Sequence, residues 1–282
     1  MNIMVSILIP TYNRAATISK TIDSFITQDF KEWEMIVVDD HSTDNTKEVV
    51  EEYHKRDPRI CYVLNERKKG AQGARNTGIL HAKAEWVCLF DSDDYAYPTF
   101  LSKMEAEINE KVDVVTSYLN IINVAEKSQT LAEWGGDGYL EKDLMTGKKY
   151  VAFNMALIRK EKLIQIGLLD EQCCAYQEWD THLSLSKICT YKAVREVLSD
   201  YYLGMPDSIS AKKKLNVDGR IYILIKHCSR WRKMAYGALV KTARHLYFDA
   251  DKAGKRKLMC AVPEIIPIIP LAYIKRKLCN QL

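Results

Sequence analysis

The chain has 282 residues, of which 47% are hydrophobic and 28% charged, and this is sufficient for one large core or a domain with an appendage. Eight cysteines are scattered without a CxxC pair, which excludes a disulfide framework or a zinc site and favours the reduced thiols of a cytoplasmic protein. The start, MNIMVSILIP, predicts no signal peptide.

The net charge of +4 hides an asymmetry along the chain. Residues 1–211 carry a balance of −9, whereas residues 212–282 carry +13. We therefore predict a catalytic domain over 1–211 and a basic extension over 212–282. A basic extension favours an anionic surface as its partner, and the alternative is a solvated basic helix.

The first hundred residues alternate between apolar runs and segments of helical spacing. VSILIP at 5–10 predicts a buried strand, because a proline ends the apolar run. Ile18, Ile22 and Phe25 then recur at helical spacing. Further strands are predicted at 33–40, 59–64 and 85–90, and helices at 42–57, 70–84 and from Pro98 onward.

This alternation predicts an α/β fold with a mostly parallel sheet and helices on both faces. Ligands bind such sheets outside the carboxyl ends of the strands. Polar residues follow each predicted strand, so we expect them to form one site. They are Thr11, Tyr12 and Asn13, then Asp39 and Asp40, then Asn65, and finally Asp91, Ser92 and Asp93.

After about residue 111 the pattern is weaker. Strands are predicted near 112–124, from 150 and at 192–204, and a helix over QEWDTHLSLSKI at 177–188. Residues 125–150 predict a loop or hairpin, and 216–250 are mostly helical.

Three aspartates within four positions, Asp91, Asp93 and Asp94, follow a buried strand. Carboxylates this close repel each other unless a cation neutralises them. The chain has neither a P-loop nor a GxGxxG sequence, so a divalent cation with a bound diphosphate is the better explanation. The sequence therefore predicts Mn²⁺ or Mg²⁺ here.

Five ordered blocks carry a resemblance to a known family: VSILIPTYNR, IVVDDHSTDNT, GARNTGILHAKAEWVCLFDSDD, GLLDEQ and QEWDTHLSL. Over roughly residues 3–210 the chain resembles the inverting nucleotide-sugar glycosyltransferases of family 2, which have the GT-A fold. The resemblance implies transfer of a sugar from a UDP-sugar to an acceptor hydroxyl with inversion, in surface-polysaccharide or glycan assembly.

The resemblance also implies roles for single residues. Asp40 would hydrogen-bond the base, typically uracil, and Arg75 would lie near the nucleotide or diphosphate. Asp93 would bind the metal with Asp94 close by, and Asp91 would lie near the ribose. The other expected nucleotide-sugar contacts are Pro10, Thr11, Tyr12 and Ser92.

The family's acidic pair before an aromatic residue corresponds to Gln177-Glu178-Trp179-Asp180. Glu178 then takes the position of the catalytic base. Glutamate replaces the usual aspartate, which leaves Asp180 as a rival base. Ser184 stands where an arginine is common in the family.

Structural explanations compete with these roles. Taken alone, Asp40 would more simply cap the helix after the second strand, and Arg75 would be a surface residue of its helix. Trp179 is better explained as a packing residue than as a platform for a sugar ring. Two other functions stay open: a haloacid-dehalogenase-type phosphatase, which also places DxD after a strand, and a non-catalytic nucleotide-sugar-binding protein.

The tail at 254–278 has basic clusters at each end of an apolar stretch that is too short to span a bilayer. It predicts contact with anionic headgroups through residues including Lys255, Lys257 and Lys277. We therefore expect a cytoplasmic, peripheral enzyme with a lipid-linked sugar acceptor and no nucleic acid partner. The alternative is a tail packed on protein.

Overall fold

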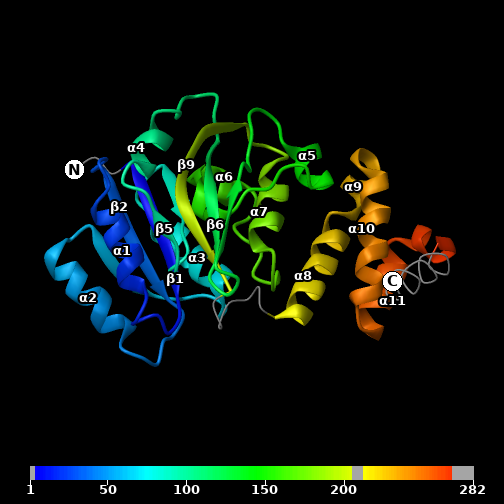
Figure 1. Ribbon diagram of the computed structural model, residues 1–282, viewed down its shortest axis with the longest axis horizontal. Helices are drawn as coiled ribbons and strands as arrows, with labels where there is room; N and C mark the ends of the chain where they lie inside the picture. The colour runs from blue at the N-terminus through cyan, green and yellow to red at the C-terminus, as the bar shows by residue number, and fades with distance from the viewer. Residues whose placement is uncertain (1–3, 205–211, 269–282) are drawn as a thin grey trace.

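The computed structural model describes residues 4–204 and 212–268. Its first part alternates strands and helices as predicted, with boundaries within a few residues of those expected (Figure 1). The elements are β1 (Val5–Thr11), α1 (Ile18–Ile26), β2 (Trp33–Asp39), α2 (Thr46–Arg56), β3 (Ile60–Leu64), α3 (Ala71–His81) and β4 (Trp86–Leu89).

The strands belong to one nine-stranded sheet in the order β3-β2-β1-β4-β8-β6-β9-β5, with β7 paired to β6. Strands β3, β2, β1 and β4 are mutually parallel. The chain moves outward from β1 to β3 and then returns to place β4 on the other side of β1. The topological switch point, where open α/β sheets bind ligands, therefore lies between the ends of β1 and β4.

Two hydrophobic clusters cover the two faces of the sheet. Val5, Ile7 and Ile9 of β1 pack with residues of α1, α2 and the later helix α4. Leu8 points to the opposite face, where the second cluster includes α3 and the helices of the C-terminal part. Because β1 is buried on both faces, its sequence is a continuous apolar run rather than an alternating one.

The middle of the chain completes the sheet. Its elements are β5 (Tyr95–Ala96), α4 (Phe100–Glu105), β6 (Val114–Asn123), β7 (Ser128–Ala132), α5 (Glu141–Thr146), the short 3-10 helix η1 (Phe153–Met155), β8 (Ala156–Arg159), α6 (Lys160–Gln165), α7 (Gln177–Leu185) and β9 (Tyr191–Leu203). The predicted hairpin after residue 125 is formed by β6 and β7, and α5 is an additional helix. Helix α4 begins at Phe100, two residues after Pro98, and Leu101 N in its first turn donates to Gln28 Oε1 at 2.9 Å.

Four helices follow and stack at one end of the molecule (Figure 1). They are α8 (Lys213–Lys226), α9 (Cys228–Met234), α10 (Tyr236–Asp249) and α11 (Lys252–Ala261), with the 3-10 helix η3 (Pro263–Ile268) after them. The predicted domain boundary at 211/212 adjoins residues 205–211, which lie outside the described residues. In the described part of the chain, no helix combines the length and apolarity that crossing a membrane requires.

Candidate functional site at the strand ends

Two strand-end loops are locked together at the switch point. Asn13 after β1 and His41 after β2 both have positive φ, 52° and 65°. Asn13 N donates to Ser42 Oγ, and Thr43 N donates to Asn13 Oδ1, each at 2.8 Å. Non-glycine residues in this conformation carry backbone strain, which concentrates at functional sites.

The predicted base-pocket residues lie at the end of β1. Pro10 and Thr11 are buried, whereas Tyr12 is 44% exposed with the Lys69 ammonium 4.7 Å from its ring centre. Among the described residues, the buried Thr11 hydroxyl oxygen has no hydrogen-bond partner. A buried hydroxyl without a partner is costly, so a ligand group bound here would satisfy it.

Asp40 does not cap α2, so the helix-cap alternative is wrong. The residue before α2 is Asn45, and the carboxylate nearest to the helix start belongs to Asp44. Asp40 instead accepts hydrogen bonds from Asn65 Nδ2 at 2.7 Å and from Gly70 N at 2.8 Å. Its carboxylate therefore holds the loop that leads into α3 and retains lone pairs for a further donor.

Arg75 of α3 is a central, buried residue, and the surface alternative is wrong. It is 5% exposed, and its guanidinium lies 4.6 Å from the Phe153 ring centre. One terminal nitrogen lies 2.5 Å from Asp91 Oδ1, and the other donates to Gln177 Oε1 at 2.9 Å. Arg75 therefore joins α3, the end of β4 and the start of α7, which come from two of the five sequence blocks.

The three aspartates after β4 have different surroundings. Asp94 is fully buried and accepts hydrogen bonds from Asn154 Nδ2 at 2.7 Å and Tyr202 N at 2.9 Å. Burial raises the pKa of Asp94 well above its ordinary value. Burial, and then repulsion from Asp91, raise the pKa of Asp93 to about 6. Asp91 and Asp93 are partly exposed, and Ser92 between them is buried.

Glu178 lies in the first turn of α7, which begins after Tyr176, a residue with a left-handed backbone and φ of 56°. The Tyr150 hydroxyl donates a hydrogen bond to Glu178 Oε1. Burial raises the pKa of Glu178, the Tyr150 hydrogen bond opposes this, and Asp91 and Arg75 act on it with opposite signs. Glu178 thus belongs electrostatically with Arg75 and Asp91, and we call these residues with Asp93 the strand-end cluster.

Asp180, only two residues further, has quite different neighbours. It is 1% exposed, and its two oxygens lie 2.7 Å from Lys226 Nζ and 2.8 Å from His227 Nε2 of the α8 end. Lys226 also lies 2.7 Å from Asp170. Two residues in a helix are separated by about 200°, so Asp180 and Glu178 face in different directions.

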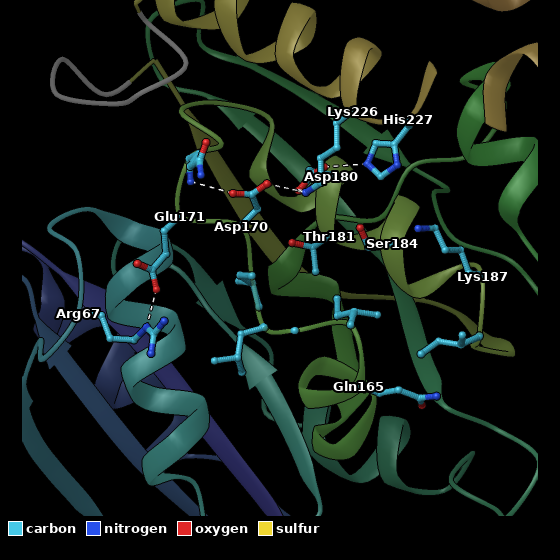
Figure 2. A pocket seen from close by; sticks show the side chains of 16 residues that line it. Arg67, Gln165, Asp170, Glu171, Asp180, Thr181, Ser184, Lys187, Lys226 and His227 are labelled. Carbon is cyan, nitrogen blue, oxygen red and sulfur yellow. Dashed lines mark hydrogen bonds and ion pairs between the residues drawn. The ribbon is translucent and has the colours of Figure 1, made fainter. Parts of the chain in front are cut away.

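Asp180 lines a cavity of about 690 Å³, which we call the rear cavity (Figure 2). Thr181, Ser184 and Lys187 also line it, whereas Glu178, Asp91 and Asp93 do not. Asp170, Asp180, Lys226 and His227 gather at one end of it, and the Arg67–Glu171 ion pair lies along one side (Figure 2). Ser184, at the family's arginine position, therefore lines the rear cavity.

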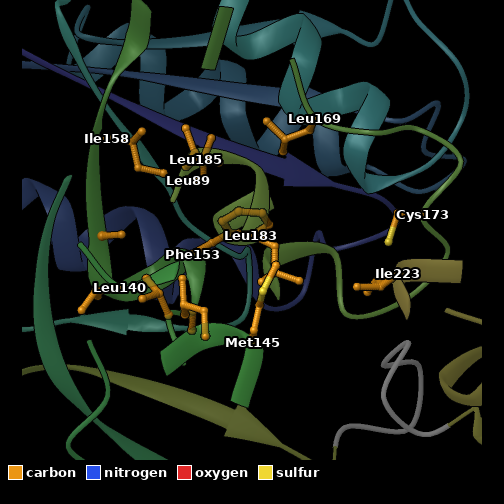
Figure 3. Packing of buried hydrophobic residues seen from close by; sticks show 14 of the residues in the cluster. Leu89, Leu140, Met145, Phe153, Ile158, Leu169, Cys173, Leu183, Leu185 and Ile223 are labelled. Carbon is orange, nitrogen blue, oxygen red and sulfur yellow. The ribbon is translucent and has the colours of Figure 1, made fainter. Parts of the chain in front are cut away.

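The remaining side chains of α7 anchor the helix. Leu183 and Leu185 belong to the same hydrophobic cluster as Leu89, Met145 and Phe153 (Figure 3). Trp179 is a packing residue, as predicted, because its ring lies 5.5 Å from that of Trp231 and its Nε1 donates to Leu144 O at 3.1 Å.

Two tyrosines that lie near the strand-end cluster were not identified from the sequence. Tyr150 lies between α5 and η1, where the predicted loop or hairpin meets a predicted strand, and no spacing marks it. Tyr201 of β9 lies among the acidic groups: burial first, and then the charges of Glu178 and Asp91, raise its pKa. The aromatic pair in KAVREVLSDYYLG was the available signal for Tyr201.

The strand-end cluster fits a divalent cation that a diphosphate helps to hold. Within residues 4–204 and 212–268, no group of three or more His, Cys, Asp or Glu side chains could hold a metal ion. Mg²⁺ and Mn²⁺ sites at phosphates need only one or two carboxylates, since phosphate oxygens and water complete the shell. Burial and Asp91 raise the pKa of Asp93 although Arg14 and Arg75 act to lower it, so these arginines balance its charge only in part and such an ion would add to them.

Two curated relatives match parts of this chain. A Campylobacter jejuni protein, named GalNAc(5)-diNAcBac-PP-undecaprenol beta-1,3-glucosyltransferase, is 39% identical over 51% of this chain and 46% of its own length. An Escherichia coli protein, named UDP-Glc:alpha-D-GlcNAc-diphosphoundecaprenol beta-1,3-glucosyltransferase WfgD, is 42% identical over 38% of this chain and 40% of its own length. The chain thus spans less than half the length of these relatives.

Two solved structures have a similar fold. TarS of S. aureus, in complex with UDP-GlcNAc, is 16% identical over 95% of this chain and 89% of that chain, with a TM-score of 0.66. The mannosyltransferase PcManGT from Pyrobaculum calidifontis, in complex with GDP-Man and Mn²⁺, is 17% identical over 98% of this chain and 80% of that chain, with a TM-score of 0.65. The predicted GT-A fold with a helical C-terminal region is confirmed.

The model of the family described as "Glycosyl transferase family 2" matches residues 6–167, which is more than half of the chain and contains β1 to α6 with the Arg75–Asp91 pair. The chain therefore belongs to glycosyl transferase family 2.

Proposed function

We propose that this protein transfers a sugar from a UDP-sugar to a hydroxyl of a lipid-linked sugar, with inversion at the anomeric carbon. The observation that carries the proposal is the Arg75 hub, which brings Asp91 within 2.5 Å and connects through Gln177 to the helix of Glu178. A donor site at the switch point and a candidate base on α7 thereby become one site.

In this proposal the nucleotide lies at the ends of β1 and β2. The Thr11 hydroxyl, which has no partner among the described residues, offers the base a donor and an acceptor, and the Asp40 carboxylate offers an acceptor, with Pro10 and Tyr12 beside them. Asp91 and Ser92 lie at the end of β4, where the ribose and diphosphate follow. Two relatives are named as glucosyltransferases, one of them with UDP-Glc, which supports UDP-glucose as the first donor to test.

Asp93 is the proposed metal ligand, and Asp94, which is bound to Asn154 and Tyr202, supports the turn around it. Bound Mn²⁺ or Mg²⁺ supplies neutralisation of the negative charge that grows on the leaving diphosphate. The PcManGT structure holds Mn²⁺, which supports a divalent cation in this fold.

Glu178 is the proposed general base. Its carboxylate takes the proton of the acceptor hydroxyl while the acceptor oxygen bonds to the anomeric carbon from the side opposite the diphosphate. The bond from that carbon to the phosphate oxygen breaks, and its electron pair leaves with UDP. The raised pKa makes Glu178 a stronger base than an exposed glutamate, and its position near Arg75 and Asp91 supports this role over that of the ion-paired Asp180.

The acceptors named for the two relatives are diphosphoundecaprenol-linked sugars, and these support a lipid-linked acceptor here. The test incubates the protein with UDP-glucose, Mn²⁺ and GlcNAc-diphosphoundecaprenol, and reads the anomeric configuration of the new linkage by NMR. A β linkage from the α-linked donor is expected. An α linkage contradicts inversion, and saturable UDP-glucose binding without any transfer or hydrolysis supports the non-catalytic alternative instead.

The donor nucleotide has a separate test. Thermal unfolding is measured with UDP-, GDP- and dTDP-glucose in the presence of Mn²⁺, since a ligand that binds the native state raises the melting temperature. UDP-glucose is expected to give the largest increase. A larger increase with GDP-glucose or dTDP-glucose contradicts the proposed base specificity.

The basic C-terminal helices are proposed to hold the enzyme at an anionic membrane surface, close to its acceptor. Arg256 and Lys257 of α11 are exposed, and Ile266 of η3 is 50% exposed. Part of the tail packs on protein: Leu258 and Ile265 are buried, and Glu264 pairs with Arg232 at 3.1 Å. The basic cluster that includes Lys277 lies outside the described residues.

Charge reversal tests this better than truncation, because removal of α11 would expose the core around Leu258. Arg256→Glu with Lys257→Glu is expected to reduce co-sedimentation with anionic vesicles, each lost charge being worth about 1 kcal/mol. Lys47→Glu with Lys55→Glu on α2 is the matched control, since both lysines are exposed. Equal binding of both variants, or equal binding to neutral vesicles, contradicts the proposal.

A further inference from the structure

A single hydroxyl group contacts the proposed base. The Tyr150 hydroxyl donates to Oε1 of Glu178, and Tyr150 comes from the segment between α5 and η1. An ionised carboxylate accepts through either oxygen, so one oxygen of Glu178 is engaged and the other stays available for a proton.

The surrounding structure fixes the Tyr150 ring. It packs edge-on against Trp134 at 4.8 Å between ring centres, and Tyr150 O accepts from Gly135 N at 2.8 Å. Gly135 has φ of 78°, and a Cβ there would lie 2.4 Å from Thr116 Oγ1, so the backbone at this contact needs glycine. The donor is therefore held by the segment that follows β7, which itself packs closely against Thr116 of β6.

Helix α7 is fixed relative to the same segment. Trp179, next to Glu178, donates through Nε1 to Leu144 O of α5, and Trp231 Nε1 donates to Met145 O at 2.8 Å. Other contacts thus anchor the chain within a few residues of both Tyr150 and Glu178. The hydrogen bond between them therefore costs little conformational entropy when it forms.

We propose that Tyr150 is a positioning residue, whose hydroxyl orients the Glu178 carboxylate and stabilises its ionised form. This inference rests on the proposed role of Glu178 as base. A hydrogen bond to the ionised form favours that form and lowers the pKa, against the effect of burial. Tyr150 itself stays a donor, because burial raises its own pKa well above the ordinary value.

Other groups around Glu178 also influence its charge. Asp91 at the end of β4 raises its pKa and Arg75 of α3 lowers it. Tyr201 of β9 interacts electrostatically with both Glu178 and Tyr150, and Tyr176 before α7 interacts with Tyr150. None of these groups is altered by removal of the Tyr150 hydroxyl, so a change in pH dependence reports on that hydroxyl.

The test is Tyr150→Phe, which keeps the ring against Trp134, with kcat measured against pH under saturating UDP-glucose, Mn²⁺ and GlcNAc-diphosphoundecaprenol. Loss of a hydrogen bond to a charged group is expected to move the acid limb of the profile upward by about one pH unit or more. Binding of UDP with Mn²⁺ is expected to stay unchanged, and the melting temperature at neutral pH is expected to fall slightly, because the ionised Glu178 loses a hydrogen bond in the folded state. Tyr139→Phe is the matched control, because Tyr139 is 76% exposed.

An unchanged profile, or a uniform decrease in kcat with no movement of the acid limb, overturns the inference. Glu178→Gln in the same assay separates this failure from failure of the proposed function. If Glu178→Gln is inactive while Tyr150→Phe behaves as wild type, only the positioning role is wrong. If Glu178→Gln keeps the wild-type rate, Glu178 is not the base and both are wrong.

Discussion

The carboxylates near the two sides of helix α7 differ in how far neighbouring positive charges balance them. In the strand-end cluster, Arg75 is the cation bonded to Asp91, and repulsion from Asp91 helps to raise the pKa of Asp93. At the rear cavity, Asp170 and Asp180 share Lys226, and Asp180 also contacts His227. Acidic charge that nearby arginines balance only in part favours a bound cation or proton transfer, whereas a carboxylate with both oxygens paired favours a structural role.

Glu178→Gln tests this difference and is expected to have the largest effect, which is on the rate of sugar transfer. Glutamine keeps the shape and an oxygen that accepts from Tyr150, but it takes up no proton from the acceptor. Transfer is expected to fall by about 10²–10⁴-fold, the contribution typical of a general base. The measurement is UDP release from UDP-glucose with acceptor, beside calorimetric titration of UDP and Mn²⁺, whose affinity is expected to stay unchanged.

Glu110→Gln is the matched control, since Glu110 is exposed on the surface. Equal loss of UDP affinity and of transfer in Glu178→Gln would mean that Glu178 contacts the donor and is not the base.

The second effect concerns stability at the rear cavity. Asp180→Asn removes the carboxylate charge that faces Lys226 Nζ and His227 Nε2, and removal of one member of a buried ion pair costs about 3–5 kcal/mol. Lys226 is 31% exposed and keeps Asp170, so we expect a value nearer about 2 kcal/mol in denaturant unfolding. The transfer rate of the folded variant is expected to change far less than that of Glu178→Gln.

The rival assignment gives a different result. If Asp180 were the base, Asp180→Asn would lower transfer as strongly as is expected for Glu178→Gln, in addition to its effect on the unfolding free energy.

The sequence alone predicted much of the first half of the fold. Strands such as β1 and β2 are buried on both faces, so their apolar runs are visible without any knowledge of their neighbours. Their polar ends predicted a shared ligand site, and the Arg75–Asp91 pair lies within 16 residues of chain.

The parts that could not be predicted depend on distant partners. Asp94 receives a hydrogen bond from Tyr202 N, 108 residues away, and its role changes from a candidate ligand to support of the turn. Asp180 and Glu178 look equivalent in QEWDTHLSL, and only Lys226, His227 and Tyr150 distinguish them, at separations of 46, 47 and 28 residues. Such contacts leave no periodicity in the sequence.

The third prediction concerns Asp93 of the strand-end cluster. Asp93→Asn removes the charge that is proposed to bind the metal, while Asp91 and its partner Arg75 remain. The affinity for UDP is expected to fall by about 10-fold or more when Mn²⁺ is present, since hard divalent cations depend on one or two carboxylates beside the phosphate. Calorimetric titration with and without Mn²⁺ measures this. If Mn²⁺ strengthens UDP binding equally in the variant, Asp93 is not its ligand.

The smallest expected effect is on the ion pair along the side of the rear cavity. Arg67 is 39% exposed at its side chain and lies 2.5 Å from Glu171, which also accepts from Asn76 Nδ2 at 2.8 Å. Arg67→Gln is expected to change the unfolding free energy at pH 7 by about 1 kcal/mol or less, because solvent screens such pairs. Denaturant unfolding at low and high salt measures the change.

The pH dependence of the unfolding free energy shows whether Arg67 acts through the ionised form of Glu171. Burial opposes ionisation of Glu171, but the hydrogen bonds from Asn76 and Arg67 lower its pKa below the ordinary value. A carboxylate with a depressed pKa contributes stability above its unfolded pKa, and this contribution is lost as the pH falls through the folded value. The difference between wild type and Arg67→Gln should therefore be largest near neutral pH and shrink below about pH 4.5. A difference that grows on acidification would mean that Arg67 acts through a group other than Glu171. A double-mutant cycle of Arg67→Gln with Glu171→Gln tests this directly, because it measures the free energy of interaction between the two side chains.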